Sequence, residues 1–162
     1  MMTTLKPGLT HTFKFKIPEN KTVPYLYPEA PEFQEMPKVL ATGFMVGLFE
    51  WTCIQAINPH IDWPREQTVG IDIKLSHLAA TPPGLSVIVK VQLEQVEGRK
   101  LVFSIVADDG IDKISEGTHH RFIIDAAKFN AKMAAKIIIS CRTKLCACDL
   151  LRNLPNMVVF QS

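Results

Sequence analysis

The feature that most constrains the fold of this 162-residue chain is the segment from Val39 to Ile57, which contains no proline and is apolar almost all round. Such a segment is expected to form a helix enclosed by other structure. It is nearly long enough to span a membrane, and Gly43-x-x-x-Gly47 resembles a membrane helix-packing motif. Glu50, however, lies in its middle, and a carboxylate at the bilayer centre is disfavoured by about 2.5 kcal/mol or more. The segment therefore predicts a buried helix of a soluble protein, with no membrane partner.

Segments with alternating apolar and polar residues flank this helix. Phe13, Phe15 and Ile17 alternate with polar residues and predict a first strand before the helix. Four alternating segments follow it, roughly Thr68 to Ala80, Leu85 to Val96, Leu101 to Asp108 and Ile114 to Ile124. Pro and Gly residues between them predict short antiparallel connections. The sequence thus indicates an α+β fold, with an antiparallel β-sheet wrapped around one long central α-helix.

Two further segments differ in composition from the predicted strands. Residues 24–37 contain four prolines among large apolar side chains, which predicts an irregular lid. Asp125 is a plausible N-cap for a short helix, whereas residues 137–162 are apolar without a clean period, so we predict no structure for them. We expect one domain over residues 1–136 and a C-terminal tail over 137–162.

Composition excludes several classes of function. Lys and Arg number 18 against 16 Asp and Glu, a net charge of +2 that favours no nucleic-acid partner. The four cysteines are Cys53, Cys141, Cys146 and Cys148, a spacing that matches neither a disulfide framework nor a common zinc pattern. We expect free thiols, no metal site, and, because residues 1–8 lack the apolar stretch of a secretory signal, a cytoplasmic protein.

Glu50 is the leading candidate for chemistry. A carboxylate in an apolar helix must be paired, protonated or used. Gly43, Gly47, Glu50 and Ile54 are spaced 4, 3 and 4, so the glycines share its face and leave room for another backbone or a ligand. The carboxylate would suit a base or a nucleophile. The alternative is a structural Glu bonded to a partner helix or an Arg.

Three other residues have a functional and a structural interpretation. His77 shares the parity of Leu75, which would point it to the buried face as half of an acid–base pair or as an ordinary core histidine. Thr42 is either an N-cap or part of an oxyanion-stabilising helix start. Arg121 either binds a phosphate or carboxylate or is solvated at a strand edge. A structural or solvated role is expected for the remaining histidines, which are His11, His60, His119 and His120.

The spacing Asp72-x4-His77 needs separate treatment, because acyl-CoA hydratases of related architecture use an Asp and a His at that separation. The two residues differ in parity within an alternating strand, so their side chains are expected on opposite faces of the sheet. This argues against a hydratase.

Several short segments of this chain together resemble the sequence pattern of one known family. They are Lys21-Thr22-Val23, Leu26-Tyr27-Pro28-Glu29, Ala41-Thr42-Gly43-Phe44-Met45-Val46-Gly47-Leu48, Glu50-Trp51, Ala79-Ala80-Thr81-Pro82-Pro83-Gly84 and Lys128-Phe129-Asn130-Ala131-Lys132. From about Gly8 to Lys136 the chain resembles the fluoroacetyl-CoA thioesterases. The resemblance implies a hot-dog-fold homodimer that hydrolyses short acyl-CoA thioesters without a metal and with no cofactor except the coenzyme A of the substrate.

Carried over by residue, the resemblance implies that Thr42, Glu50 and His77 form the catalytic set. Gly70 would offer backbone contact to the acyl end, Arg121 would lie nearby, and Gly43 would leave room beside the substrate. In the lid, Phe33 would also meet the substrate, and Met36 stands where the fluoroacetyl-selective enzyme has a Phe. Alternatives are a non-catalytic acyl-CoA-binding module and an enoyl-CoA hydratase of the same fold.

The spacing of Thr42 and Glu50 bears on assembly. Eight residues apart on one helix, they are separated by about 12 Å along its axis, too far for both to touch one carbonyl. We therefore predict a homodimer whose sites combine Thr42 of one chain with Glu50 of the other, unless the helix departs from straightness.

Overall fold

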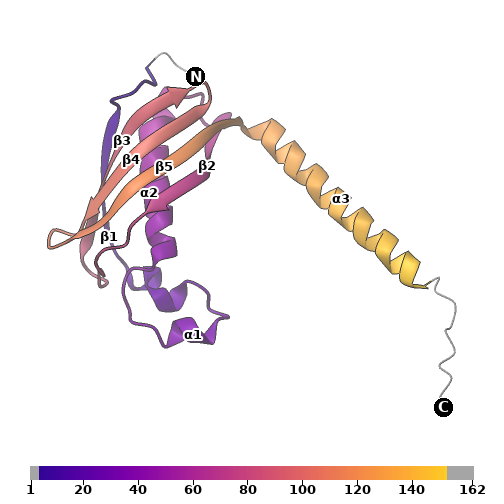
Figure 1. Cartoon of the computed structure of the whole chain (residues 1–162), viewed down its shortest axis with the longest axis horizontal. Coiled ribbons are helices and arrows are strands. Elements are labelled where there is room, and N and C mark those ends of the chain that lie inside the picture. The colour runs from indigo at the N-terminus through magenta and orange to yellow at the C-terminus, as the bar shows by residue number, and fades with distance from the viewer. Residues whose placement is uncertain (1–3, 153–162) are drawn as a thin grey trace. The chain divides into compact units, whose positions relative to one another are not determined.

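We describe the protein from a computed structural model, which covers residues 4–152, with side chains up to Ile139. The chain divides into two units, 1–124 and 125–162, which are described separately. The first unit contains β1 (Thr10–Lys16), α2 (Thr42–Ile57), β2 (Glu66–Leu75), β3 (Ser86–Glu97), β4 (Lys100–Asp108) and most of β5 (Lys113–Asp125). The strand order is β1-β3-β4-β5-β2. Figure 1 shows this sheet curving over α2, as the α+β prediction requires.

The sheet is antiparallel at the three pairings β1–β3, β3–β4 and β4–β5. Gly98 and Gly110 in the two hairpin turns have φ of +58° and +85°, a conformation that glycine adopts without a steric cost. Both turns lie where the sequence predicts them. The short antiparallel connection predicted between β2 and β3 is wrong, because these two strands are not neighbours in the sheet. The remaining neighbour of β5 is β2, which reaches the opposite edge of the sheet from β1.

The helix α2 is anchored to the sheet by one apolar stripe. Met45, Phe49, Cys53 and Ile57 are spaced four apart, all with no exposed surface, and they belong to the core that the sheet residues Val89, Leu93, Phe103 and Ile105 complete. The expectation that α2 is enclosed on every side is wrong for the single chain. Gly43, Gly47 and Trp51, also spaced four apart, lie on an exposed stripe, and Trp51 retains 46% of its surface.

The helix begins at Thr42, three residues later than the predicted Val39. The preceding backbone is engaged elsewhere, since Leu40 N–H donates to the Thr81 carbonyl and Ala41 N–H donates to the Lys21 carbonyl. These bonds fix the direction from which the chain enters α2. They also place the start of the helix beside the loop that follows β2.

The proline-rich segment contains two short helical turns rather than the wholly irregular lid of our prediction. They are η2 (Val23–Tyr25) and α1 (Pro31–Gln34), and in each a proline occupies one of the first two positions, where its missing N–H costs nothing. Between them Tyr27 stacks on Phe33 with ring centroids 5.9 Å apart. Met36 follows α1 and is 49% exposed.

The strand β2 ends at Leu75, before the predicted limit of Ala80. At Ser76 the side chain replaces part of the main-chain ladder, because Glu116 N–H donates to Ser76 Oγ while Ser76 N–H donates to the Glu116 carbonyl. A further bond from Leu78 N–H to the Ile114 carbonyl keeps the following loop beside β5. His77 therefore lies on a tethered loop and not within the strand.

The second unit contains α3 (Ala126–Arg152). Asp125 caps it as predicted, since Lys128 N–H donates to Asp125 Oδ1 at 3.0 Å. The helix is longer than the short one predicted and runs through Ile137–Ile139. The boundary between the two units lies between Ile124 and Asp125. Cys141, Cys146, Cys148 and residues 153–162 fall outside the described side chains. Within residues 4–152, no helix has both the length and the hydrophobicity to cross a membrane.

Candidate active site

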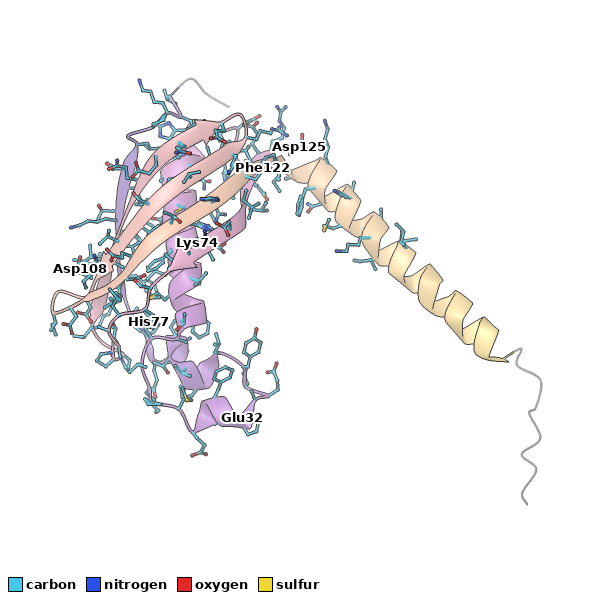
Figure 2. The ribbon with its side chains drawn as sticks, viewed as in Figure 1. Glu32, Lys74, His77, Asp108, Phe122 and Asp125 are labelled. Atoms are coloured by element: carbon cyan, nitrogen blue, oxygen red, sulfur yellow. The ribbon has the colours of Figure 1, made fainter. Side chains whose placement is uncertain are left out.

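Thr42 and His77 form a pair at the start of α2. Ala41 is the N-cap residue and makes no side-chain cap bond, and the Thr42 hydroxyl is instead hydrogen-bonded to His77 Nδ1 at 2.8 Å. Both residues are exposed in the single chain. Figure 2 shows His77 at the end of the sheet nearest α1. The N-cap interpretation of Thr42 is thus wrong, and so is the expected burial of His77, because β2 ends before it.

Glu50 lies about two turns further along α2, in different surroundings. Its Oε1 is 3.4 Å from Arg121 Nη1 and 3.6 Å from His119 Nε2. The Glu50 side chain is 41% exposed. The carboxylate is therefore paired with an arginine on one side and open on the other, rather than desolvated as the apolar helix suggested.

Arg121 is a buried cation on β5, so a solvated strand edge is excluded. Its side chain is 2% exposed. Its Nε donates to Thr68 Oγ1 at 3.0 Å, and its Nη2 donates to the Thr68 carbonyl at 2.8 Å. Burial lowers the pKa of Arg121 while Glu50 raises it. An arginine remains charged under these influences, which leaves a fixed positive charge facing Glu50.

A glycine is required at position 70 on β2, because the Glu50 carboxylate closely approaches the backbone there. A Cβ at this position would lie 2.5 Å from Glu50 Oε1 and 3.0 Å from His119 Cε1. The carboxylate therefore rests directly on the backbone of β2, a contact that no other residue type permits without movement. At the start of α2, a Cβ on Gly43 would lie 2.9 Å from Leu26 Cδ1, so this glycine accommodates a side chain of the lid.

His119 is the residue that sequence reasoning missed. It is 2% exposed and stands beside Glu50 and Arg121. A signal was available, since positions 119 and 121 share one parity on β5 and must face the same side of the sheet. We call Glu50, Gly70, His119 and Arg121 the Glu50 cluster, and Thr42 with His77 the Thr42–His77 pair.

Asp72 belongs to neither group. Its carboxylate is 3.6 Å from His120 Nδ1 on the outer side of the sheet, while His77 contacts Thr42 of the central helix. The two side chains thus have different surroundings, but strand parity is not the reason, because β2 ends at Leu75 and His77 lies on the loop that follows. An Asp–His hydratase pair is therefore not formed.

A separate apolar cavity of about 280 Å³ lies on the β1 side of α2. Its lining is Phe15, Ile17, Lys21, Leu40, Gly43, Phe44, Gly47, Leu48 and Trp51. Of the proposed substrate contacts it includes Gly43 alone. Phe33, Met36 and the side chains of the Glu50 cluster do not line it.

Comparison with known proteins places this geometry in a family. A family model described as fluoroacetyl-CoA-specific thioesterase matches residues 26–127. The fluoroacetyl-CoA thioesterase of Streptantibioticus cattleyicolor is 50% identical over 132 residues, which are 82% of this chain and 94% of that protein. A crystal structure of a fluoroacetyl-CoA-specific thioesterase variant, in complex with fluoroacetate and CoA, matches with a TM-score of 0.75 and 50% identity, covering 77% of this chain and 99% of that one.

A hot-dog-like protein from Thermanaerovibrio acidaminovorans, 18% identical, matches with a TM-score of 0.67 over 80% of this chain and 91% of that one, and it shows the fold alone. The antiparallel sheet wrapped on one helix is thus a hot-dog fold. The chain, whose helix holds a carboxylate at the sheet, is a thioester hydrolase of this class. Within this class, the chain belongs to the fluoroacetyl-CoA-specific thioesterase family.

Proposed function

We propose that this protein hydrolyses short-chain acyl-CoA thioesters to the free acid and CoA. The observation that carries the proposal is the Glu50 carboxylate, which rests on the Gly70 backbone and pairs with the buried Arg121 while one side stays open. The relatives named for thioester hydrolysis support it. The site needs no cofactor beyond the CoA of the substrate, because its own residues supply a carboxylate, a proton carrier and an oxyanion site.

The chemistry divides between the two groups of residues. Glu50 either attacks the thioester carbonyl, forming an anhydride that water then hydrolyses, or removes a proton from the attacking water. His77 gives a proton to the sulfur of the departing CoA and recovers one from the attacking water, directly when that water hydrolyses the anhydride, or by way of Glu50 when the carboxylate acts as the base. The Thr42 hydroxyl and the free N–H groups at the start of α2 bind the carbonyl oxygen and stabilise the negative charge that it gains.

A homodimer would bring these groups together. In one chain, Thr42 and Glu50 stand about 12 Å apart along the axis of α2, and His77 contacts only the nearer of the two. The strand β2 carries Gly70 and is an edge strand of the sheet. It exposes 51% of Ile71, an apolar residue that a second chain would cover. We infer a two-fold dimer in which the Thr42–His77 pair of one chain faces the Glu50 cluster of the other.

Release of free thiol from acetyl-CoA and propionyl-CoA by the purified protein tests the proposed activity. Glu50→Gln keeps the shape of the side chain and removes the base or nucleophile, so we expect kcat to fall by about 10²-fold or more with folding unchanged. Glu97→Gln, an exposed carboxylate at the end of β3, is the matched control and should keep the parental rate. Parental turnover by Glu50→Gln would refute the assignment. Binding of acyl-CoA without any hydrolysis by the parent would favour the non-catalytic binding module.

The cellular location belongs to the proposal as well. Cys53 is a buried free thiol, which is typical of proteins that work in a reducing compartment. We therefore propose a cytoplasmic enzyme.

A further inference from the structure

His119 occupies the centre of the Glu50 cluster but has no part in the chemistry described above. Both ring nitrogens have partners. Nδ1 is 3.0 Å from the Asp72 carbonyl oxygen, and Nε2 is 2.9 Å from Arg121 Nη1. The ring is buried, and its Cε1 lies against the Gly70 backbone.

These partners determine where the ring carries its hydrogen. A guanidinium only donates hydrogen bonds, so Nε2 accepts from Arg121. A carbonyl oxygen only accepts, so Nδ1 carries the hydrogen and donates to Asp72. His119 is therefore neutral, with Nδ1 protonated. Nε2 has no hydrogen to offer Glu50, and their 3.6 Å separation is a contact without an ion pair.

The surroundings oppose a second proton on this ring. Burial is the main influence that lowers the pKa of His119, and the positive charge of Arg121 lowers it further. The Asp72 carbonyl and Glu50 act in the opposite direction, and His120 on the same strand adds to the lowering. A proton on Nε2 would also point at the Nη1 hydrogens of Arg121. His119 is thus unsuited to carry protons, in contrast to the exposed His77.

We propose that His119 is a positioning residue, which acts as a fixed neutral acceptor that orients the Arg121 guanidinium towards the Glu50 carboxylate. Thr68 holds Nε and Nη2 of the arginine, and His119 holds Nη1, the atom that faces Glu50. With all three nitrogens held, the guanidinium has one orientation relative to Glu50. The carboxylate that pairs with it is therefore directed to the open side of the cluster. This role rests on the proposed function of Glu50 in thioester hydrolysis.

Two amide substitutions separate the two hydrogen bonds of the ring. In His119→Gln the amide oxygen reaches the position of Nε2 and still accepts from Arg121. In His119→Asn the amide reaches only the position of Nδ1, so it serves Asp72 and leaves Nη1 without an acceptor. Each is measured for kcat and KM with acetyl-CoA, beside His120→Gln as a control on the outer side of β5.

We expect His119→Asn to lower kcat about 10- to 100-fold with KM changed less than threefold, because hydrogen bonds to charged groups are worth roughly 1.5–3 kcal/mol. His119→Gln should recover most of that loss, and the control should match the parent. Equal kcat in the Asn and Gln variants, whether both high or both low, would overturn the proposal. An active Glu50→Gln would instead overturn the proposed function.

A second measurement needs no substitution. Nitrogen-15 NMR of the histidine rings in the parental protein at pH 7 distinguishes the two neutral tautomers from the protonated ring. We expect His119, assigned by its loss in the Gln variant or by site-specific labelling, to be neutral with its hydrogen on Nδ1. A ring with its hydrogen on Nε2, or a doubly protonated ring, would overturn the proposal even if both variants failed to fold.

Discussion

Replacing Gly70 by alanine is the most informative single perturbation of the Glu50 cluster. The added methyl group would lie 2.5 Å from Glu50 Oε1, whereas ordinary contact begins at 3.4 Å, so the carboxylate must retreat by about 0.9 Å. The Glu50 side chain is 41% exposed and can move into solvent. His119 is buried, however, and its Cε1 at 3.0 Å must also yield by a few tenths of an ångström.

The expected consequence is a loss of rate without a matching loss of fold. A displacement of about 1 Å from the productive geometry costs roughly 10²-fold in rate, so kcat should fall by that factor. Stability should fall by only about 1–2 kcal/mol, the cost of one extra methyl group against atoms that can partly move. Thiol release at saturating acetyl-CoA measures kcat, and urea unfolding followed by circular dichroism measures the free energy of unfolding.

A compensating substitution makes this test specific to the contact with Glu50. Glu50→Asp shortens the side chain by one methylene group and leaves room for the alanine methyl. The double variant Gly70→Ala/Glu50→Asp should therefore be more active than the product of the two single losses predicts. Strictly additive losses, or a kcat for Gly70→Ala within threefold of the parent, would refute the contact between the carboxylate and the β2 backbone.

Three further predictions concern other parts of the chain. The pKa of buried His119 lies below its ordinary value of 6.5, so the unfolded state takes up a proton that the folded state refuses, and the free energy of unfolding should fall between about pH 7 and 5 by up to ~1.4 kcal/mol per pH unit. Urea unfolding at several pH values should show that the free energy of unfolding of His119→Gln depends less on pH than that of the parent. An unchanged pH dependence would contradict this. Burial raises the pKa of the Cys53 thiol to about 12, so iodoacetamide at pH 8 should label Cys53 only after unfolding. Stoichiometric labelling of Cys53 in the native protein, seen by peptide mass spectrometry, would contradict the packing described. Met36→Phe should raise the ratio of kcat/KM for fluoroacetyl-CoA to kcat/KM for acetyl-CoA by about tenfold, because apolar fit is worth roughly 1–3 kcal/mol. An unchanged ratio would show that Met36 does not contact the acyl group.

The main elements of the fold could be predicted because their signals are local. The apolar segment around Glu50 predicts α2, and the alternation of residues such as Val89 and Val91 predicts the strands. The ends of elements depend on bonds to distant residues. The start of α2 is delayed by Thr81 and Lys21, and β2 stops where the Ser76 hydroxyl enters the ladder. None of these bonds is visible in a local pattern.

The candidate site was predictable by residue type but not by arrangement. The apolar helix singled out Glu50, yet the pairing with Arg121 depends on β5 lying next to β2, a strand order that alternation does not encode. The same order places His119 against Gly70. Parity on β5 could have joined His119 to Arg121, but only the distances of 3.6 and 3.4 Å from their side chains to Glu50 Oε1 show that both face Glu50.

Each site of the proposed homodimer combines the Thr42–His77 pair of one chain with the Glu50 cluster of the other. Mixing two inactive variants, His77→Ala and Glu50→Gln, after reversible unfolding tests this arrangement. In a randomly mixed two-fold dimer, half of the molecules pair the two variants, and each of these holds one intact and one doubly impaired site. Shared sites should restore about a quarter of the parental thiol-release rate on mixing. A mixture that stays as inactive as its components would show that the sites are not shared.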